Sequence, residues 1–171
     1  MNDDFKLIDP ERVSDNPFHL IGNDWMLITA GNVQKFNTMT ASWGGMGILW
    51  RKKVCFIFIR PSRYTYEFLE ENESFTLSFF EEEYRKALSF CGTKSGRDVD
   101  KIAATGLTPV EGKQGAIYFE EAKLVMECKK IYYQDLEPGN FLDSSIEENY
   151  YGRDYHRIYV GEIIGCYVKE S

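Results

Sequence analysis

The chain has 171 residues, of which 43% are hydrophobic and 15% aromatic, and its formal net charge is −7. This length suits one domain with a buried core, and the acidic balance argues against a nucleic-acid partner. No apolar run approaches the roughly 20 residues of a membrane helix, and the polar, acidic start is unlike a signal peptide. We therefore expect a soluble cytoplasmic protein that does not associate with membranes.

The four cysteines are widely spaced and form neither a Cys-x-x-Cys pair nor a cluster with histidine. A zinc or iron–sulfur site is therefore not expected. Cys55 lies inside an apolar run, where a reduced cysteine packs as a small hydrophobic side chain. The sequence predicts free thiols and no metal site, in keeping with a cytoplasmic location.

The first 23 residues are punctuated by proline and glycine. They predict an arm with little regular structure, which Phe18 and Leu20 attach to the body. A single domain is expected to follow over residues 24–171.

The domain begins with a predicted hairpin, whose strands at 25–30 and 36–42 are joined by a Gly-Asn turn signal. Residues 43–47 contain three glycines and predict a loop. Residues 54–59 are six consecutive apolar residues, mostly β-branched or aromatic. Such a short, wholly apolar run is typical of a strand buried on both faces.

The segment 60–65, with sequence RPSRYT, leaves the end of this buried strand. A buried strand is rigid, so groups at its end are held in place. Guanidinium groups, hydroxyls and backbone N–H groups that converge there form an anion site. The alternative is that Arg60 and Arg63 are surface charges and that the hydroxyl-rich segment 37–42 faces solvent.

A short helix is predicted after Arg63, capped by Ser62 or Thr65. Residues 74–79 alternate apolar and hydroxyl side chains, which predicts a half-buried strand, and residues 81–90 predict a second helix.

Ser95 to Asp98 resembles a capping box that opens a helix ending at Gly106. Helix N-termini attract phosphate, and Ser95, Arg97 and Lys101 would strengthen that attraction. The alternative is a plain capped helix.

Strands are predicted at 123–133 and 155–168, with a polar, partly helical connector at 141–151. Gly161 and Gly165 in the last strand indicate bulges or close backbone approaches. Six or more antiparallel strands close more readily into a β-barrel than into an open sheet.

Four motifs, NTMTASW, RPSRYT, SGRDVDK and YHRIYVGEIIG, occur in this order between residues 24 and 168. Together they resemble the flavin reductase-like family of FMN-binding split barrels. The resemblance implies a mainly β, split-barrel fold with a few short helices. It also implies FMN as cofactor (FAD is possible), NAD(P)H as a transient co-substrate, a homodimer and a possible redox protein partner. Many members have proline where this chain has Lys53.

The resemblance assigns the flavin phosphate to Arg63, Ser95 and Lys101, assisted by Thr65. It assigns the polar edge of the ring to residues 37–42, with Arg60 close enough to stabilise the reduced ring and raise its potential. Met39, Pro61, Trp43 and Trp50 are candidates for covering the ring faces. The expected cofactor contacts are Asn37, Thr38, Met39, Thr40, Ala41, Ser42, Trp43, Arg60, Pro61, Arg63, Tyr64, Thr65, Ser95, Gly96 and Lys101.

His156 lies at a position that resembles the family's histidine near the flavin, and is the expected catalytic residue. It would orient nicotinamide or donate a proton; the alternative is a hydrogen-bonded histidine at the start of a strand. The absence of a Gly-x-Gly-x-x-Gly motif implies that NAD(P)H binds only transiently.

The expected function is an FMN-binding, flavin reductase-like oxidoreductase that uses NAD(P)H to reduce bound flavin and passes the electrons on. The alternatives are a flavoredoxin-like electron carrier without its own NAD(P)H activity, and a non-enzymatic flavin-binding protein.

Overall fold

The computed structural model describes residues 4–170 and is mainly β. The strands are β1 (Phe5–Leu7), β2 (Met26–Gly31), β3 (Phe36–Ala41), β4 (Gly45–Leu49), β5 (Lys52–Ile59), β6 (Ser74–Phe79), β7 (Pro109–Glu111), β8 (Ile117–Phe119), β9 (Leu124–Asp135) and β10 (Arg157–Lys169). The α-helices are α1 (Pro17–His19), α2 (Tyr64–Glu71), α3 (Arg85–Thr93) and α4 (Lys101–Thr105). Short 3-10 turns span Pro10–Arg12, Glu82–Tyr84, Pro138–Asn140, Ser144–Asn149 and Tyr151–Arg153, and a π turn spans Leu20–Asp24.

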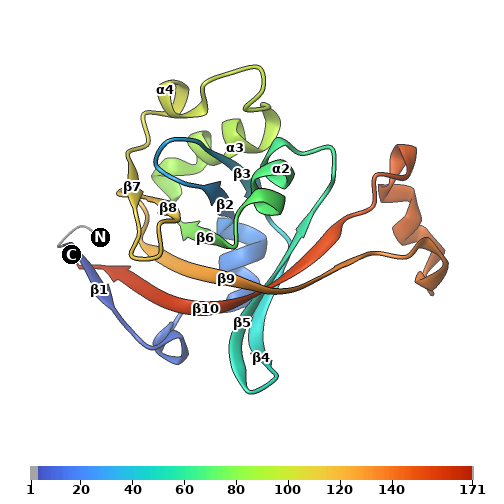
Figure 1. Cartoon of the computed structure of the whole chain (residues 1–171), viewed down its shortest axis with the longest axis horizontal. Coiled ribbons are helices and arrows are strands. Elements are labelled where there is room, and N and C mark those ends of the chain that lie inside the picture. The colour runs from blue at the N-terminus through green and yellow to red at the C-terminus, as the bar shows by residue number, and fades with distance from the viewer. Residues whose placement is uncertain (1–3, 171) are drawn as a thin grey trace.

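One curved antiparallel sheet organises the molecule (Figure 1). Its strand order is β3-β2-β6-β9-β10-β5-β4, with β1 added against β10, while β7 and β8 form a separate ladder. β3 and β4 end this order, and no ladder joins them within residues 4–170, so the barrel is left open. The helices α2 and α3 pack on β2 and β3.

Two hydrophobic clusters lie on opposite faces of the central strands. Successive side chains of a strand point to opposite faces, so Met26 and Ile28 of β2 pack in one cluster while Leu27 packs in the other. Met126 and Val125 divide β9 in the same way. These strands are therefore held by apolar burial on both sides.

The burial of two strands differs from the predictions. β6 is buried along nearly its whole length rather than half-buried, because it lies between β2 and β9 and Thr76 donates a hydrogen bond to the Ile117 carbonyl of β8. β5, in contrast, is not buried on both faces. Phe56 and Phe58 remain half-exposed, and Phe58 lines a pocket described below.

Residues 45–49 form strand β4, so the loop predicted over 43–47 ends earlier than expected. Gly44 has φ +146°, and a Cβ there would lie 2.6 Å from the Phe56 carbonyl oxygen, so this close approach requires glycine. Trp50 and Arg51 also have positive φ, which makes the tight turn from β4 into β5.

The helix caps were predicted wrongly, although the predicted start of a helix after Arg63 is confirmed. α2 begins after Arg63 without a side-chain cap, because the Ser62 hydroxyl contacts Asp154. The Ser95 hydroxyl accepts the Arg97 N–H in a turn. The next helix, α4, starts only after Asp100, whose carboxylate accepts two backbone N–H groups. Asp100 therefore replaces the expected capping box, while the predicted end at Gly106 is confirmed.

The N-terminal segment is more ordered than predicted. β1 pairs with the end of β10, and Leu20 is fully buried, as expected of an attachment point. Phe18 is 87% exposed and does not attach the segment. The hairpin of β2 and β3 is confirmed, as are register shifts beside Gly161 and Gly165.

All four cysteines are free thiols, as predicted, and all are buried, although burial was expected of Cys55 alone. Within the described residues, no helix is long and apolar enough to cross a membrane, and no group of acidic, histidine and cysteine side chains could hold a metal ion.

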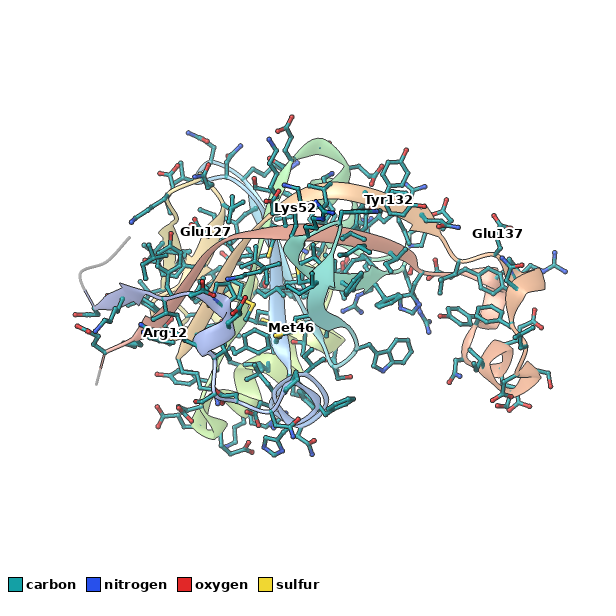
Figure 2. The ribbon with its side chains drawn as sticks, turned by 90° about the horizontal axis from the view of Figure 1, so that it is seen from below. Arg12, Met46, Lys52, Glu127, Tyr132 and Glu137 are labelled. Carbon is teal, nitrogen blue, oxygen red and sulfur yellow. The ribbon has the colours of Figure 1, made fainter. Side chains whose placement is uncertain are left out.

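Residues 136–156, called the β9–β10 arm here, extend away from the body. Figure 1 shows the arm beyond the ends of β9 and β10, and Figure 2 shows the same projection past Glu137 from a perpendicular direction. The rings of Phe141, Tyr150 and Tyr155 pack together, with centroids 4.9–6.0 Å apart. The predicted polar connector is therefore a series of 3-10 turns around an aromatic cluster.

Candidate functional site

Two adjoining pockets lie where β3, the end of β5, the start of α2 and the end of α3 meet. The Trp43 pocket, about 340 Å³, is lined by Met39, Thr40, Ala41, Ser42, Trp43, Phe58, Arg60, Ser62, Arg63, Gly92 and His156. The Lys101 pocket, about 200 Å³, is lined by Asn37, Met39, Ser62, Arg63, Tyr64, Thr65, Thr93, Lys94, Ser95, Gly96 and Lys101. Met39, Ser62 and Arg63 line both pockets, so the two form one continuous site.

β3 supplies backbone groups to this site because it is a terminal strand. It pairs with β2 on one edge only, so alternate N–H and C=O groups on its other edge have no strand partner. The strand is also bound to two neighbouring helices. The backbone carbonyl of Thr38 accepts a hydrogen bond from Lys101 of α4, and the side-chain hydroxyl of Thr40 donates one to the Leu88 carbonyl of α3. The remainder of the edge is available to a flat, polar-edged ligand.

Lys101 is the buried cation of the site. Its side chain is 6% exposed, and Nζ donates to the carbonyls of Thr38 at 2.7 Å and Cys91 at 2.8 Å. An ammonium group has three donors, so one remains for a ligand. Burial lowers the pKa of Lys101 to about 8, which still leaves most of the group charged at neutral pH.

Arg63 and Arg60 bring further positive charge. Arg63 donates to the Gly92 carbonyl at 2.9 Å, and burial, followed by the neighbouring Arg60, lowers its pKa. Arg60 donates to the Asn149 carbonyl at 2.9 Å and lies 5.4 Å from the Tyr150 ring centroid. Both guanidinium groups are therefore fixed by carbonyls, and neither forms an ion pair with a carboxylate of residues 4–170.

Tyr150 of the β9–β10 arm positions His156. Its hydroxyl lies 3.0 Å from Nδ1 of His156, whose ring is also 5.2 Å from that of Trp43. Burial, followed by Arg60, lowers the pKa of His156 to about 4 against the opposing effect of Asp154. The imidazole is therefore neutral at pH 7 and can act as a hydrogen-bonding group.

This lowered pKa predicts a pH-dependent stability. Between pH 6.5 and 4 the unfolded chain binds a proton at His156 that the folded chain does not, so unfolding becomes easier as the pH falls. The slope contributed is at most about 1.4 kcal/mol per pH unit. We expect His156→Gln to flatten the decline of the urea midpoint between pH 7.5 and 5, and the exposed His19→Gln variant to retain it. Equal slopes in both variants would contradict the assignment.

Gly96 and Asn37 approach each other too closely for any larger residue. A Cβ at Gly96 would lie 2.0 Å from Oδ1 of Asn37, whose Nδ2 donates to the Thr65 hydroxyl at 2.7 Å. Asn37 and Thr65 are both buried, so the amide has little room to yield.

We expect Gly96→Ala to displace Asn37 into the Lys101 pocket and to weaken ligand binding there about tenfold, the equivalent of one hydrogen bond. Isothermal titration with FMN measures this effect. Gly139→Ala, where a Cβ meets nothing within 4 Å and φ is not positive, is the matched control, because φ at Gly96 is not positive either. If both variants lost the same FMN affinity, the contact between residue 96 and Asn37 would not be the cause.

Comparison with known proteins shows which family the chain belongs to. Residues 18–171 match the flavin reductase like domain, which is most of the chain. The chain belongs to the flavin reductase-like family. An uncharacterised protein of Archaeoglobus fulgidus is 28% identical over 139 residues, covering 81% of this chain and 68% of the relative.

Two solved structures extend the comparison. The flavoredoxin of Methanosarcina acetivorans has a TM-score of 0.67 and 26% identity, over 86% of this chain and 69% of that one. An FMN-binding domain of a flavin reductase-like enzyme from Shewanella baltica has a TM-score of 0.70 and 17% identity, over 96% and 77% of the two chains, which shows the fold alone. The open sheet is thus the split barrel predicted from the motifs.

Most of the residues expected to contact the flavin lie together in the structure. Thirteen of the expected fifteen cofactor residues, together with His156, line one or both pockets. Thr38 instead contributes its carbonyl to Lys101 while its hydroxyl meets that of Thr29. Pro61 is exposed in the turn before α2, outside both linings. Trp50 lies at the exposed β4–β5 turn beside Tyr132 and covers neither pocket.

Sequence reasoning missed three lining residues, namely Phe58, Gly92 and Thr93. Ser62, from the predicted anion-binding segment, and Lys94, a sequence candidate for a positive pocket, do line the site. Phe58 could have been found, because it shares a strand face with Arg60 two residues later. Gly92 and Thr93 could not, because they reach the site through the packing of α3 on β3.

The residues present fit a flavin mononucleotide. The Lys101 pocket is lined by three cations, Arg63, Lys94 and Lys101, and by the hydroxyl residues Thr65 and Ser95, which suit a phosphate. The Trp43 pocket combines the unpaired edge of β3 with Met39 and Trp43, which suits a flat ring with one polar edge.

Proposed function

We propose that this protein is an FMN-binding oxidoreductase of the flavin reductase type, which uses NAD(P)H and passes electrons to free flavin, a metal complex or a protein. A bound FMN would supply the redox chemistry, accepting a hydride and releasing electrons. The observation that carries the proposal is the continuous site, cationic at the Lys101 end and aromatic at the Trp43 end.

In this proposal the residues of the chain bind and orient. Lys101 and Arg63 hold the phosphate, and β3 fixes the polar edge of the ring. Arg60, 5.4 Å from the Tyr150 ring and bound to the Asn149 carbonyl, keeps a positive charge at the Trp43 pocket. His156, neutral and held by Tyr150, offers a hydrogen bond to an incoming nicotinamide.

The visible absorption spectrum tests cofactor binding first. Protein as purified, and protein desalted after incubation with excess FMN, should show retained flavin bands. A colourless protein after both treatments would contradict the proposal.

Stopped-flow mixing with NADH and NADPH tests the reaction. Rapid bleaching of the flavin is expected for a reductase. The similarity to the Methanosarcina flavoredoxin favours a second candidate, an electron carrier reduced by another protein. A carrier would retain flavin but would not bleach with either nicotinamide. A protein that holds flavin and exchanges no electrons with any donor would be a non-enzymatic flavin-binding protein.

A homodimer is also proposed. Leu142 and Ile146 on the β9–β10 arm, and Trp43 beside the site, are exposed apolar side chains that a second copy would cover. Light scattering during size-exclusion chromatography should give twice the mass of the chain. A cytoplasmic location stays a prediction from the sequence.

A further inference from the structure

The last part of the β9–β10 arm, residues 149–154, binds three side chains that line the Trp43 pocket, namely Arg60, Ser62 and His156. The Asn149 carbonyl accepts a hydrogen bond from Arg60 at 2.9 Å, and the Tyr150 hydroxyl lies 3.0 Å from Nδ1 of His156. Asp154 accepts hydrogen bonds from the backbone N–H and the hydroxyl of Ser62. One short segment therefore fixes several polar groups of the pocket at once.

Two rings of the arm hold Tyr150 in place. The Phe141 ring stacks on the Tyr150 ring, with centroids 5.7 Å apart and an interplanar angle of 23°, and the Tyr155 ring lies 4.9 Å from it. The Arg60 guanidinium lies 5.4 Å from the centroid of the same Tyr150 ring. Because packed aromatic rings restrict one another, the places of His156 and Arg60 depend on the two rings behind Tyr150.

Phe141 is remote from the site that it supports. It lines neither the Trp43 pocket nor the Lys101 pocket, and it belongs to the arm that extends away from the body in Figure 1. The cations of the Lys101 pocket have other anchors. Arg63 binds the Gly92 carbonyl, and Lys101 binds two further carbonyls, of β3 and α3. The aromatic cluster of the arm is therefore connected to the Trp43 end of the site.

We propose that Phe141 and Tyr155 are positioning residues for the reaction at the Trp43 pocket, which hold Tyr150 and through it set the places of His156 and Arg60. This inference rests on the proposed function. Neither ring would touch flavin or nicotinamide. A displaced His156 would orient the nicotinamide poorly, and a misplacement of about 1 Å caused by a distant change can slow a reaction by about 10²-fold. A displaced Arg60 would stabilise the reduced ring less.

The first test uses the chain without flavin and follows His156 by NMR titration. Burial, followed by Arg60 and Arg63, lowers the pKa of His156 to about 4, and Asp154 opposes them. Phe141→Ala should admit water to the imidazole and release Arg60, so the pKa of His156 should rise by about one unit or more. The signal that is absent from His156→Gln identifies the residue.

Three further variants are the controls for this titration. Phe141→Tyr keeps the stacked ring and should restore the wild-type pKa of His156. Phe141→Leu keeps apolar bulk without the ring and should give an intermediate pKa; it carries the test if Phe141→Ala does not fold. Leu142→Ala removes the neighbouring side chain, which is 102% exposed, and should leave the pKa of His156 unchanged.

The second test uses the FMN-loaded protein. In Phe141→Ala, the rate of flavin bleaching by NADH or NADPH should fall about tenfold, and the midpoint potential of the bound flavin should become more negative. The Kd for FMN should stay within about twofold of the wild type, because the arm does not anchor the cations of the Lys101 pocket. A purely structural role would lower the unfolding midpoint without moving the rate or the potential.

The outcomes separate this inference from the proposed function. An unchanged pKa of His156 in Phe141→Ala, or a raised pKa with an unchanged bleaching rate, would overturn the positioning role. An equal pKa shift in Leu142→Ala would assign the effect to the whole arm and overturn the role of Phe141. If the wild type retains no FMN, the proposed function fails, and the titration without flavin still decides whether Phe141 holds His156.

Discussion

Arg63→Ala combined with Lys101→Ala is expected to abolish retention of FMN. Of the three cations that line the Lys101 pocket, these two are buried or partly buried, whereas Lys94 is exposed. Each would form a charge-assisted hydrogen bond to a phosphate bound there. Losing both should cost on the order of 3–6 kcal/mol, or roughly 10²- to 10⁴-fold in Kd. Isothermal titration with FMN, or flavin fluorescence after desalting, measures the loss.

Lys101 also supports the fold, so the double variant needs two controls. Removing its ammonium group leaves the carbonyls of Thr38 and Cys91 without their donor. Arg63→Ala alone removes the donor of one carbonyl only, that of the partly exposed Gly92, so it should lower the unfolding midpoint less than Lys101→Ala and still lose part of the affinity. Arg51→Ala with Lys86→Ala removes the same charge from exposed positions outside the pockets and should bind FMN normally. Wild-type FMN affinity in the Arg63/Lys101 variant would disprove the phosphate assignment.

Gly31→Ala is expected to destabilise the protein by about 2–5 kcal/mol, through backbone strain and overlap. Gly31 has φ +116°, and a Cβ there would lie 2.3 Å from the Lys35 carbonyl oxygen and 2.5 Å from Cα of Phe36. Because both obstacles are in or beside the backbone, the β2–β3 turn itself must move. Urea unfolding monitored by tryptophan fluorescence measures the change.

The same substitution at Gly139 is the control, because a Cβ there meets nothing within 4 Å. Gly139→Ala should unfold within about 0.5 kcal/mol of the wild type. Gly31→Ala should also weaken FMN binding, since β3 starts at the distorted turn and carries the ring edge of the site. An unchanged midpoint in Gly31→Ala would show that the turn can relax without cost.

The parts of the fold that could be predicted are those encoded by local signals. The β2–β3 hairpin follows from an apolar strand at 25–30, a Gly-Asn turn and a hydroxyl-rich segment without a helical apolar period, and the bulges at Gly161 and Gly165 follow from glycines within a strand. The helix cap was missed because Ser95 and Asp100 both have capping side chains, and only the folded chain shows which one meets free N–H groups. The burial of β6 was missed because it depends on β2 and β9 at its edges.

The candidate site likewise has a part that could be predicted from the sequence and a part that could not. Residues that follow one another along β3, or leave the end of β5, could be predicted because the chain itself keeps them together. The contacts of Asp154 with Ser62, and of Tyr150 with His156, belong to the β9–β10 arm and its return to the sheet. Ser62 and Asp154 are 92 positions apart, and nothing in either segment alone indicates that they meet.

The pairing of β1 with the end of β10 makes the chain suitable for circular permutation. Phe5 and Lys169 are register partners, so a short linker can join the two ends without crossing the body. Reopening the chain at Gly139, in an exposed 3-10 turn, would place the new ends on the β9–β10 arm. β9 and β10 would then terminate the chain instead of being covalently joined through the arm. The stability of such a permutant would show how much the covalent connection adds to the stability that the packed strands provide.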